Sequence, residues 1–121
     1  MIENFRKFET GPDPFGRMWQ VEFRWLQTAI AIRHADTVDV KFAISNGDEW
    51  EEKVIALPHT DLLALSAQTG RALTDPWCMK LGALHLVRMI ETSDDMDKVI
   101  VTPQYEELES YNAALEQSKA A

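Results

Sequence analysis

A run of alternating apolar and polar residues between Trp19 and Ile32 constrains the fold of this chain more than any other feature. A period of two is typical of a strand with one buried face, and one extra residue near positions 25–27, a β-bulge, would correct the slip in phase. We therefore expect one long, bent strand with a bulge in its middle and tryptophans on its inner face. The inner positions are first Trp19, Val21, Phe23 and Trp25 and then, out of step, Leu26, Thr28, Ile30 and Ile32.

A second strand is predicted over residues 37–45, after a tight turn. If the turn places Ile32 opposite Val38, the apolar positions of the two strands coincide, because Leu26 then faces Ile44. A slip by one residue would place every apolar side chain opposite a polar one. The inner positions of this strand are Val38, Val40, Phe42 and Ile44.

A third strand is predicted over residues 49–57, because Asn46-Gly47-Asp48 is a strong hairpin signal. A three-residue loop would align Ile44 with Trp50, whereas a two-residue loop would align Lys41 with Glu52. We favour the first register, because exposed ion pairs contribute little to stability. It places Glu52 on the inner face.

The outer face of this predicted meander carries several small residues and therefore forms a shallow, flat surface. Such a face is either exposed to solvent or covered by a helix, a ligand or another subunit. Its residues are Gln27, Ala29, Ala31, Arg33, Lys41, Ala43 and Lys53.

Two consecutive helices follow Pro58, which ends the sheet. The first is predicted over residues 61–69, with Thr60 as its N-cap and Gly70 as its C-terminal cap. The second begins at Asp75-Pro76, with Asp75 as N-cap, and runs to about residue 92.

The second helix is apolar almost all round, which is typical of a buried helix. It is too short and too charged to span a bilayer. We expect it to cover the tryptophan-bearing face of the sheet. Its far side would pack on the first helix or across a dimer interface.

The two ends of the chain are less regular. Residues 1–17 are expected to form an N-terminal arm or a short helix that lies on the domain or reaches a neighbouring subunit, because glycines and prolines fill their second half. After an acidic loop, Val99–Val101 form a short fourth strand or an extended lead-in to a last helix over residues 104–116. Residues 118–121 are expected to fray.

Composition limits the classes of partner. The 121 residues suit one domain, over residues 18–117, and 20 acidic against 12 basic side chains leave a net charge of −8. This charge disfavours duplex nucleic acid and anionic membrane surfaces as partners. The N-terminus lacks the apolar run of a signal peptide, and the single Cys78 indicates a reducing compartment, so we expect a soluble, cytoplasmic protein.

Cys78 and His85 share one face of the second helix, two turns apart. They form either a thiol–imidazole site or, more simply, a buried structural cysteine and a core or interface histidine. A separation of roughly 10 Å along the helix axis is too large for one zinc ion to bind both. The aspartates at 94, 95 and 97 lack the spacing of a calcium loop, and we expect no metal and no cofactor.

The four tryptophans form either a shared core or an aromatic cage for a ligand. No phosphate-binding glycine loop and no hydrolase, metalloprotease or paired-cysteine motif occurs in the chain. The residues that a ligand pocket between sheet and helices would use are Trp19, Trp25, Trp77, Cys78 and His85.

These observations predict an α+β domain: a bent three-stranded antiparallel meander, with or without a short fourth strand, covered on one face by two or three helices. The function they favour is that of a non-catalytic protein-interaction or adaptor module, which self-associates as a homodimer or binds another protein. The alternative is a small-molecule binder or modest enzyme that uses the aromatic-lined pocket.

Overall fold

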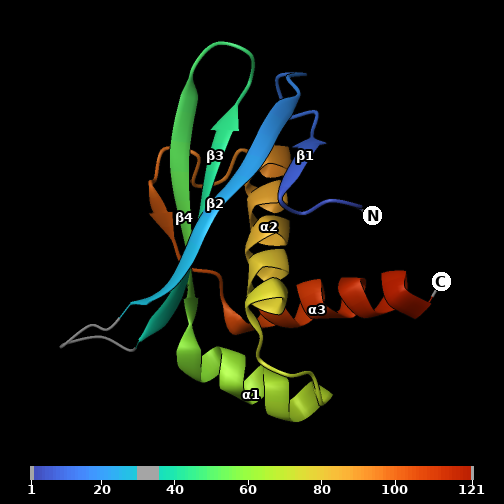
Figure 1. The fold of residues 1–121 in the computed structure, drawn as a ribbon. Coiled ribbons are helices and arrows are strands. Elements are labelled where there is room, and N and C mark those ends of the chain that lie inside the picture. Colours follow the sequence, from blue (N-terminus) through green and yellow to red (C-terminus); the bar gives the residue numbers. More distant parts are fainter. Residues whose placement is uncertain (1, 30–35, 121) are drawn as a thin grey trace.

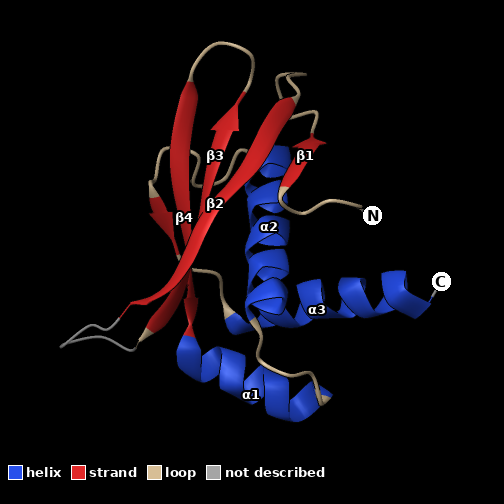
Figure 2. Cartoon of the chain, viewed as in Figure 1, coloured by secondary structure: helices blue, strands red, loops and turns tan. Residues whose placement is uncertain are grey.

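The computed structural model describes residues 2–29 and 36–120 and belongs to the α+β class (Figure 1). A five-stranded sheet has the strand order β1-β2-β3-β4-β5, antiparallel except for the parallel pair β4 and β5. Figure 2 shows α2 along one face of the sheet, with α1 and α3 near one end of α2. The elements are β1 (Lys7–Thr10), β2 (Trp19–Ala29), β3 (Thr37–Ser45), β4 (Trp50–Pro58), α1 (His59–Thr69), α2 (Asp75–Thr92), β5 (Ile100–Val101) and α3 (Tyr105–Ala120).

The N-terminal stretch is part of the sheet rather than a separate arm or short helix. Strand β1 pairs with β2 and places Phe8 opposite Val21, while Phe5 is buried in the core. A strand of four residues is too short to show a periodic pattern, and for this reason the sequence did not indicate it. The sheet therefore has five strands where three or four were predicted.

The predicted bulge is present in β2, slightly earlier than expected. The register with β3 shifts between Phe23 and Trp25, so Arg24 is the extra residue. Because the bulge precedes Trp25, this side chain points to the outer face, where it lies opposite Lys41 with its ring 5.2 Å from Nζ. Of the two tryptophans predicted on the inner face of this strand, only Trp19 is buried there.

The register between β2 and β3 differs from the predicted one by an even slip. Leu26 lies opposite Val40 and Thr28 opposite Val38, whereas the sequence suggested Ile44 and Phe42 as their partners. Both registers keep apolar residues on one face, so the period-two pattern does not distinguish them. The pairings predicted for Ile30 and Ile32, and residues 34 and 35 of the turn predicted at 34–36, lie outside the described residues.

The register that the sequence favoured between β3 and β4 is wrong by one residue, which exchanges the inner and outer faces of β4. Ser45 lies opposite Trp50, and Ile44 faces Glu51. Glu52 is thus on the outer face, where its carboxylate lies 3.1 Å from Nζ of Lys41. The inner face instead receives Lys53, which is 2% exposed. Ile55 and Leu57 continue this inner face, and both are fully buried.

The first helix starts earlier than predicted, and the second is capped by a different residue. Helix α1 begins at His59 directly after Pro58, so Thr60 is not its cap, while Gly70 ends it in the left-handed conformation with φ 75°. The N-cap of α2 is Thr74 rather than Asp75, because the Thr74 side chain accepts from the backbone N–H of Trp77. Asp75 lies in the first turn of α2, where its negative charge interacts favourably with the helix dipole.

Helix α2 is buried, as its sequence predicts, but its far side packs on α3 and not on the first helix or across a dimer interface. The sheet covers one side, where Gly82 packs against Val40, and α3 covers another, so Leu81 and Leu86 are fully buried. No second subunit is needed to cover this helix. In the described residues, no helix is long and apolar enough to cross a membrane.

The short strand predicted at the C-terminal side exists as β5, which pairs with β4 through Ile100 and Val101. Helix α3 continues to Ala120, beyond the predicted end at 116 and into the stretch expected to fray. It begins with one half of a capping box, in which Oε1 of Glu107 accepts from the backbone N–H of Gln104 at 3.0 Å.

Candidate functional site

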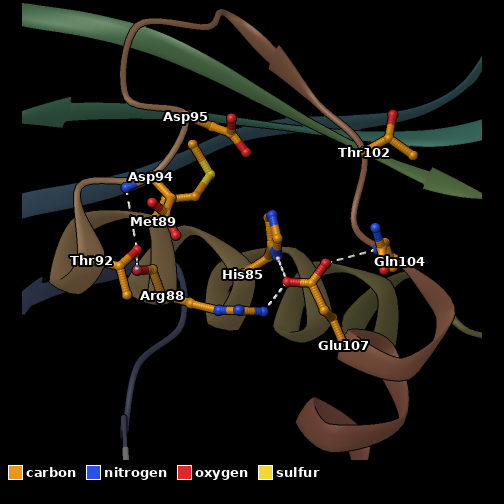
Figure 3. A pocket seen from close by; sticks show the side chains of 9 residues that line it. All are labelled: His85, Arg88, Met89, Thr92, Asp94, Asp95, Thr102, Gln104 and Glu107. Atoms are coloured by element: carbon orange, nitrogen blue, oxygen red, sulfur yellow. Dashed lines mark hydrogen bonds and ion pairs between the residues drawn. The ribbon is translucent and has the colours of Figure 1, made fainter.

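A polar cavity of about 270 Å³ lies where the second half of α2 meets the loop after it and the start of α3 (Figure 3). Two stretches of the sequence build its walls: residues 85–95, from α2 into the loop that follows it, and residues 102–107. The lining residues are His85, Arg88, Met89, Thr92, Asp94, Asp95, Thr102, Gln104 and Glu107.

His85 forms the floor of this cavity and is only 5% exposed. Its Nδ1 atom lies 2.8 Å from the hydroxyl oxygen of Tyr111 and 3.7 Å from Oε2 of Glu107. Its Nε2 atom is buried and has no hydrogen-bond partner among the described residues. Figure 3 shows this second nitrogen directed toward the space between Asp95 and Thr102. An unpaired buried nitrogen is costly, typically by about 1–3 kcal/mol.

Glu107 holds the histidine side of the cavity in place. Besides capping α3, its carboxylate accepts a hydrogen bond from the guanidinium of Arg88. The charge of Arg88 is therefore balanced within the wall of the cavity. Because Glu107 is anchored at both oxygens, its position beside the imidazole is set by the packing of α3 on α2.

We assign to His85 the tautomer with its proton on Nδ1, which makes its Nε2 atom a hydrogen-bond acceptor. Burial lowers the pKa of His85, an effect that the nearby carboxylates of Glu107 and Asp95 oppose and Arg88 reinforces, so the ring is neutral near pH 7. A carboxylate beside Nδ1 favours the tautomer with its proton on that atom. The Nδ1–H then donates to Tyr111, and the lone pair of Nε2 faces the cavity.

The acidic loop opposite His85 is held by a buried lysine of the sheet. Nζ of Lys53 donates to the carbonyl oxygens of Met96 at 2.6 Å and Lys98 at 2.7 Å. Within the loop, the carboxylate of Asp95 lies 3.1 Å from Nζ of Lys98. These contacts tie the segment that carries Asp94 and Asp95 to strand β4, and the carboxylates are thereby presented to the cavity by a well-anchored turn.

Of the five residues that the sequence proposed for a ligand pocket, only His85 lines this cavity. Trp19 donates through Nε1 to Asp13 at 3.0 Å, and Trp77 donates to Oδ1 of Asn112 at 2.9 Å, both inside the core. Trp25 lies on the outer face of the sheet. Burial and the nearby Asp75 raise the pKa of Cys78 to about 11, so its thiol is protonated and unreactive near neutral pH.

A second cavity, of about 240 Å³, does lie between β2 and the start of α2. Its walls contain none of the four tryptophans. They are formed by Arg6, Phe23, Leu26, Asp75, Pro76 and Met79. Among the described residues, no group of three histidine, cysteine or acidic side chains is placed to hold a metal ion.

The partners of His85 were not visible in the sequence. Arg88 follows His85 by three residues and so shares its helix face, and Glu107 and Tyr111 share a face of α3 by the same rule. Nothing in the pattern of either helix shows that these two faces meet. No protein-family model, curated protein or solved structure matches this chain, so its function is inferred from geometry.

Proposed function

We propose that this protein binds a small polar molecule in the cavity above His85. The observation that carries the proposal is the buried Nε2 atom, which faces the cavity and has no hydrogen-bond partner in the part of the chain that the structure describes. Buried polar atoms are nearly always hydrogen-bonded, and exceptions mark functional sites or bound ligands. A ligand that donates to this nitrogen removes the cost of leaving it unpaired.

The size and position of the cavity support a small ligand. At about 270 Å³, it lies just below the range of roughly 300–1,000 Å³ that is usual for ligand pockets. It is built where helices and a loop converge, and its polar groups come from two stretches of the sequence, which is how proteins fix the orientation of a ligand. The proposal is of binding without a chemical step.

A screen of small cationic, neutral and anionic compounds by two-dimensional NMR tests this proposal. We expect a binder to shift backbone resonances of residues 85–95 and 102–107, and we expect His85→Phe to abolish the effect. His59→Phe is the matched control, because His59 lies at the start of α1, away from the cavity. Binding that survives unchanged in a folded His85→Phe variant contradicts the proposal.

A second candidate function is protein interaction through the outer face of the sheet, with a homodimer as its simplest form. One cross-strand row on this face consists of Trp25, Lys41, Val54 and Ile100. The side chain of Trp25 is 36% exposed and that of Ile100 is 63% exposed. Helix α2 lies on the opposite side of the sheet (Figure 2), and no helix among the described residues covers this row, in which three of the four side chains are apolar.

Sedimentation equilibrium at high micromolar concentration tests the dimer. We expect Ile100→Asp to shift the protein toward monomer, because a buried charge opposes association. Leu63→Asp is the matched control, since Leu63 is an exposed leucine on α1. A wild-type protein that is strictly monomeric at this concentration removes the homodimer and leaves a different protein as the partner.

The proposal also covers the classes of partner and the cellular location. The net charge of −8 supports a partner or ligand other than duplex nucleic acid or an anionic membrane surface. Cys78 is a free, buried thiol, which supports a cytoplasmic location.

A further inference from the structure

The walls of the His85 cavity are rich in hydrogen-bond acceptors. The lone pair of Nε2 points inward from the floor, and the carboxylates of Asp94 and Asp95 belong to the opposite wall. Figure 3 shows the Asp95 carboxylate and the His85 ring directed toward the same space. A ligand that only accepts hydrogen bonds could be bound by the donors of the lining, such as Arg88 and Gln104, but it would leave Nε2 without a donor.

The charge of the lining is negative. The guanidinium of Arg88 is paired with Glu107, so these two charges cancel inside the wall. The carboxylates of Asp94 and Asp95 remain, and within residues 2–29 and 36–120 only Asp95 has a basic partner, Lys98, which lies outside the lining. A cation in the cavity would be attracted by this excess, and an anion would be repelled.

We infer that the ligand of this cavity is a small organic ammonium ion, whose N–H groups donate to Nε2 of His85 and to the carboxylate of Asp95. This inference rests on the proposed binding function and specifies its ligand class. An ammonium group offers up to three donors at a single centre, so it satisfies the buried nitrogen and the carboxylate at once. The remainder of the molecule occupies the rest of the cavity.

A bare divalent metal ion fits the cavity less well than an ammonium ion. Metal binding needs several oxygen or nitrogen ligands within about 2.0–2.6 Å of one point. The described residues place no three such groups together. A volume of about 270 Å³ also holds several non-hydrogen atoms rather than one ion.

The acidic wall is fixed before the ligand arrives. Lys53 anchors the loop through Met96 and Lys98, so Asp95 does not need to be ordered by the ligand. Asp95 itself has a φ of 58°, in the left-handed region. Asparagine adopts this conformation readily, so Asp95→Asn removes the charge and retains the turn.

The test compares four probes of similar size by NMR titration: butylammonium, butan-1-ol, butyrate and tetramethylammonium. We expect butylammonium alone to shift the cavity resonances strongly. Tetramethylammonium carries the charge without N–H donors, and butan-1-ol carries a donor without the charge. Asp95→Asn should weaken butylammonium binding roughly tenfold, because a hydrogen bond to a charged group is lost. Asp97→Asn is the matched control, since Asp97 is in the same loop but outside the lining.

Stronger binding of butyrate or butan-1-ol at the cavity overturns the ammonium inference and leaves the small-molecule proposal intact. Equal affinity of butylammonium for Asp95→Asn and for the wild-type protein overturns it as well. Magnesium and calcium chloride are titrated in parallel, and tighter Asp95-dependent binding of either ion would replace the ammonium ion by a metal. If none of the probes shifts the cavity resonances, the inference fails, and the wider compound screen then decides the proposed function separately.

Discussion

Nζ of Lys53 donates a hydrogen bond of 2.6 Å to the carbonyl oxygen of Met96, across 43 residues of sequence. The lysine occupies an inner-face position of β4, opposite Phe42, where an apolar residue would be expected. Its ammonium group donates to backbone carbonyl oxygens of the acidic loop, at Met96 and Lys98. Two hydrogen bonds to backbone carbonyl oxygens and the carboxylate of Glu51, 3.9 Å from Nζ, compensate the burial of this charge.

Lys53→Met should destabilise the fold and loosen the loop that carries Asp95. The methionine fills most of the volume but leaves the carbonyl oxygens of Met96 and Lys98 without their donor, which should lower the free energy of unfolding by about 2–3 kcal/mol. Urea denaturation measures this value. Lys41→Met is the control with the same chemical change at a partly exposed ion pair, and it should cost less than about 1 kcal/mol. Equal costs for the two variants would contradict the anchoring role.

Asn112→Leu should destabilise the contact between α2 and α3. It leaves the indole N–H of Trp77 unpaired in the core, at a cost of about 1–3 kcal/mol. The same change made in a Trp77→Phe background should cost less, because the N–H is then absent. A double-mutant cycle measured by denaturation gives the coupling energy. No coupling between the two positions would show that the hydrogen bond contributes nothing.

Gly82→Ala should destabilise the protein even though alanine is the better helix former. A Cβ at position 82 would lie 3.2 Å from Cβ of Val40, a fully buried side chain on β3. Overpacking of about 1–3 kcal/mol then exceeds the gain of about 1 kcal/mol in helix propensity. Thermal unfolding of the single variants and of Gly82→Ala/Val40→Ala checks this. The two changes should compensate in part, and purely additive losses would argue against the close contact.

The stability of the protein should fall as the pH drops below about 6.5, the ordinary pKa of histidine, because of His85. Burial lowers the pKa of His85 in the folded protein, so the unfolded chain takes up a proton that the folded chain does not. The free energy of unfolding should decline by at most about 1.4 kcal/mol per pH unit from this group, until the pH reaches the folded pKa. Denaturation of wild type, His85→Phe and His59→Phe across this pH range measures this dependence. The slope of the unfolding free energy against pH should be reduced in His85→Phe and unchanged in His59→Phe.

Asp13→Asn should weaken the N-terminal turn and flatten the acid limb of the stability profile. Burial tends to raise the pKa of Asp13, but hydrogen bonds from Trp19, Arg17 and Phe15 outweigh it and hold this pKa well below its ordinary value of 3.8. The stability that the carboxylate contributes is therefore present above pH 3.8 and is lost as the pH falls below it. Thermal melts from neutral to acid pH measure this, with the exposed Asp48→Asn as control. A variant as stable as wild type at neutral pH would contradict this role.

The local pattern of the sequence determined the elements that carry enough residues to show a period. The alternation in β2 and β3, the bulge near Trp25 and the apolar length of α2 all appear in the structure, and the α+β class follows from them. Strand β1 was not predicted, because its four residues are too few to show an alternation of apolar and polar side chains. Turn signals such as Asn46-Gly47 located a hairpin but left its loop length open.

Tertiary packing decided the registers and the site. An even slip between two alternating strands keeps every apolar residue inside, so only the packing of the whole sheet against α2 selects Val40 as the partner of Leu26. The cavity is assembled in the same way. His85 is visible in the sequence as a polar residue on an apolar helix, but its unpaired nitrogen, its neighbour Glu107 and the anchored loop exist only because α3 and β4 pack beside α2. Short-range periodicity reports which side of an element is buried, whereas a site made of distant segments depends on which buried sides meet.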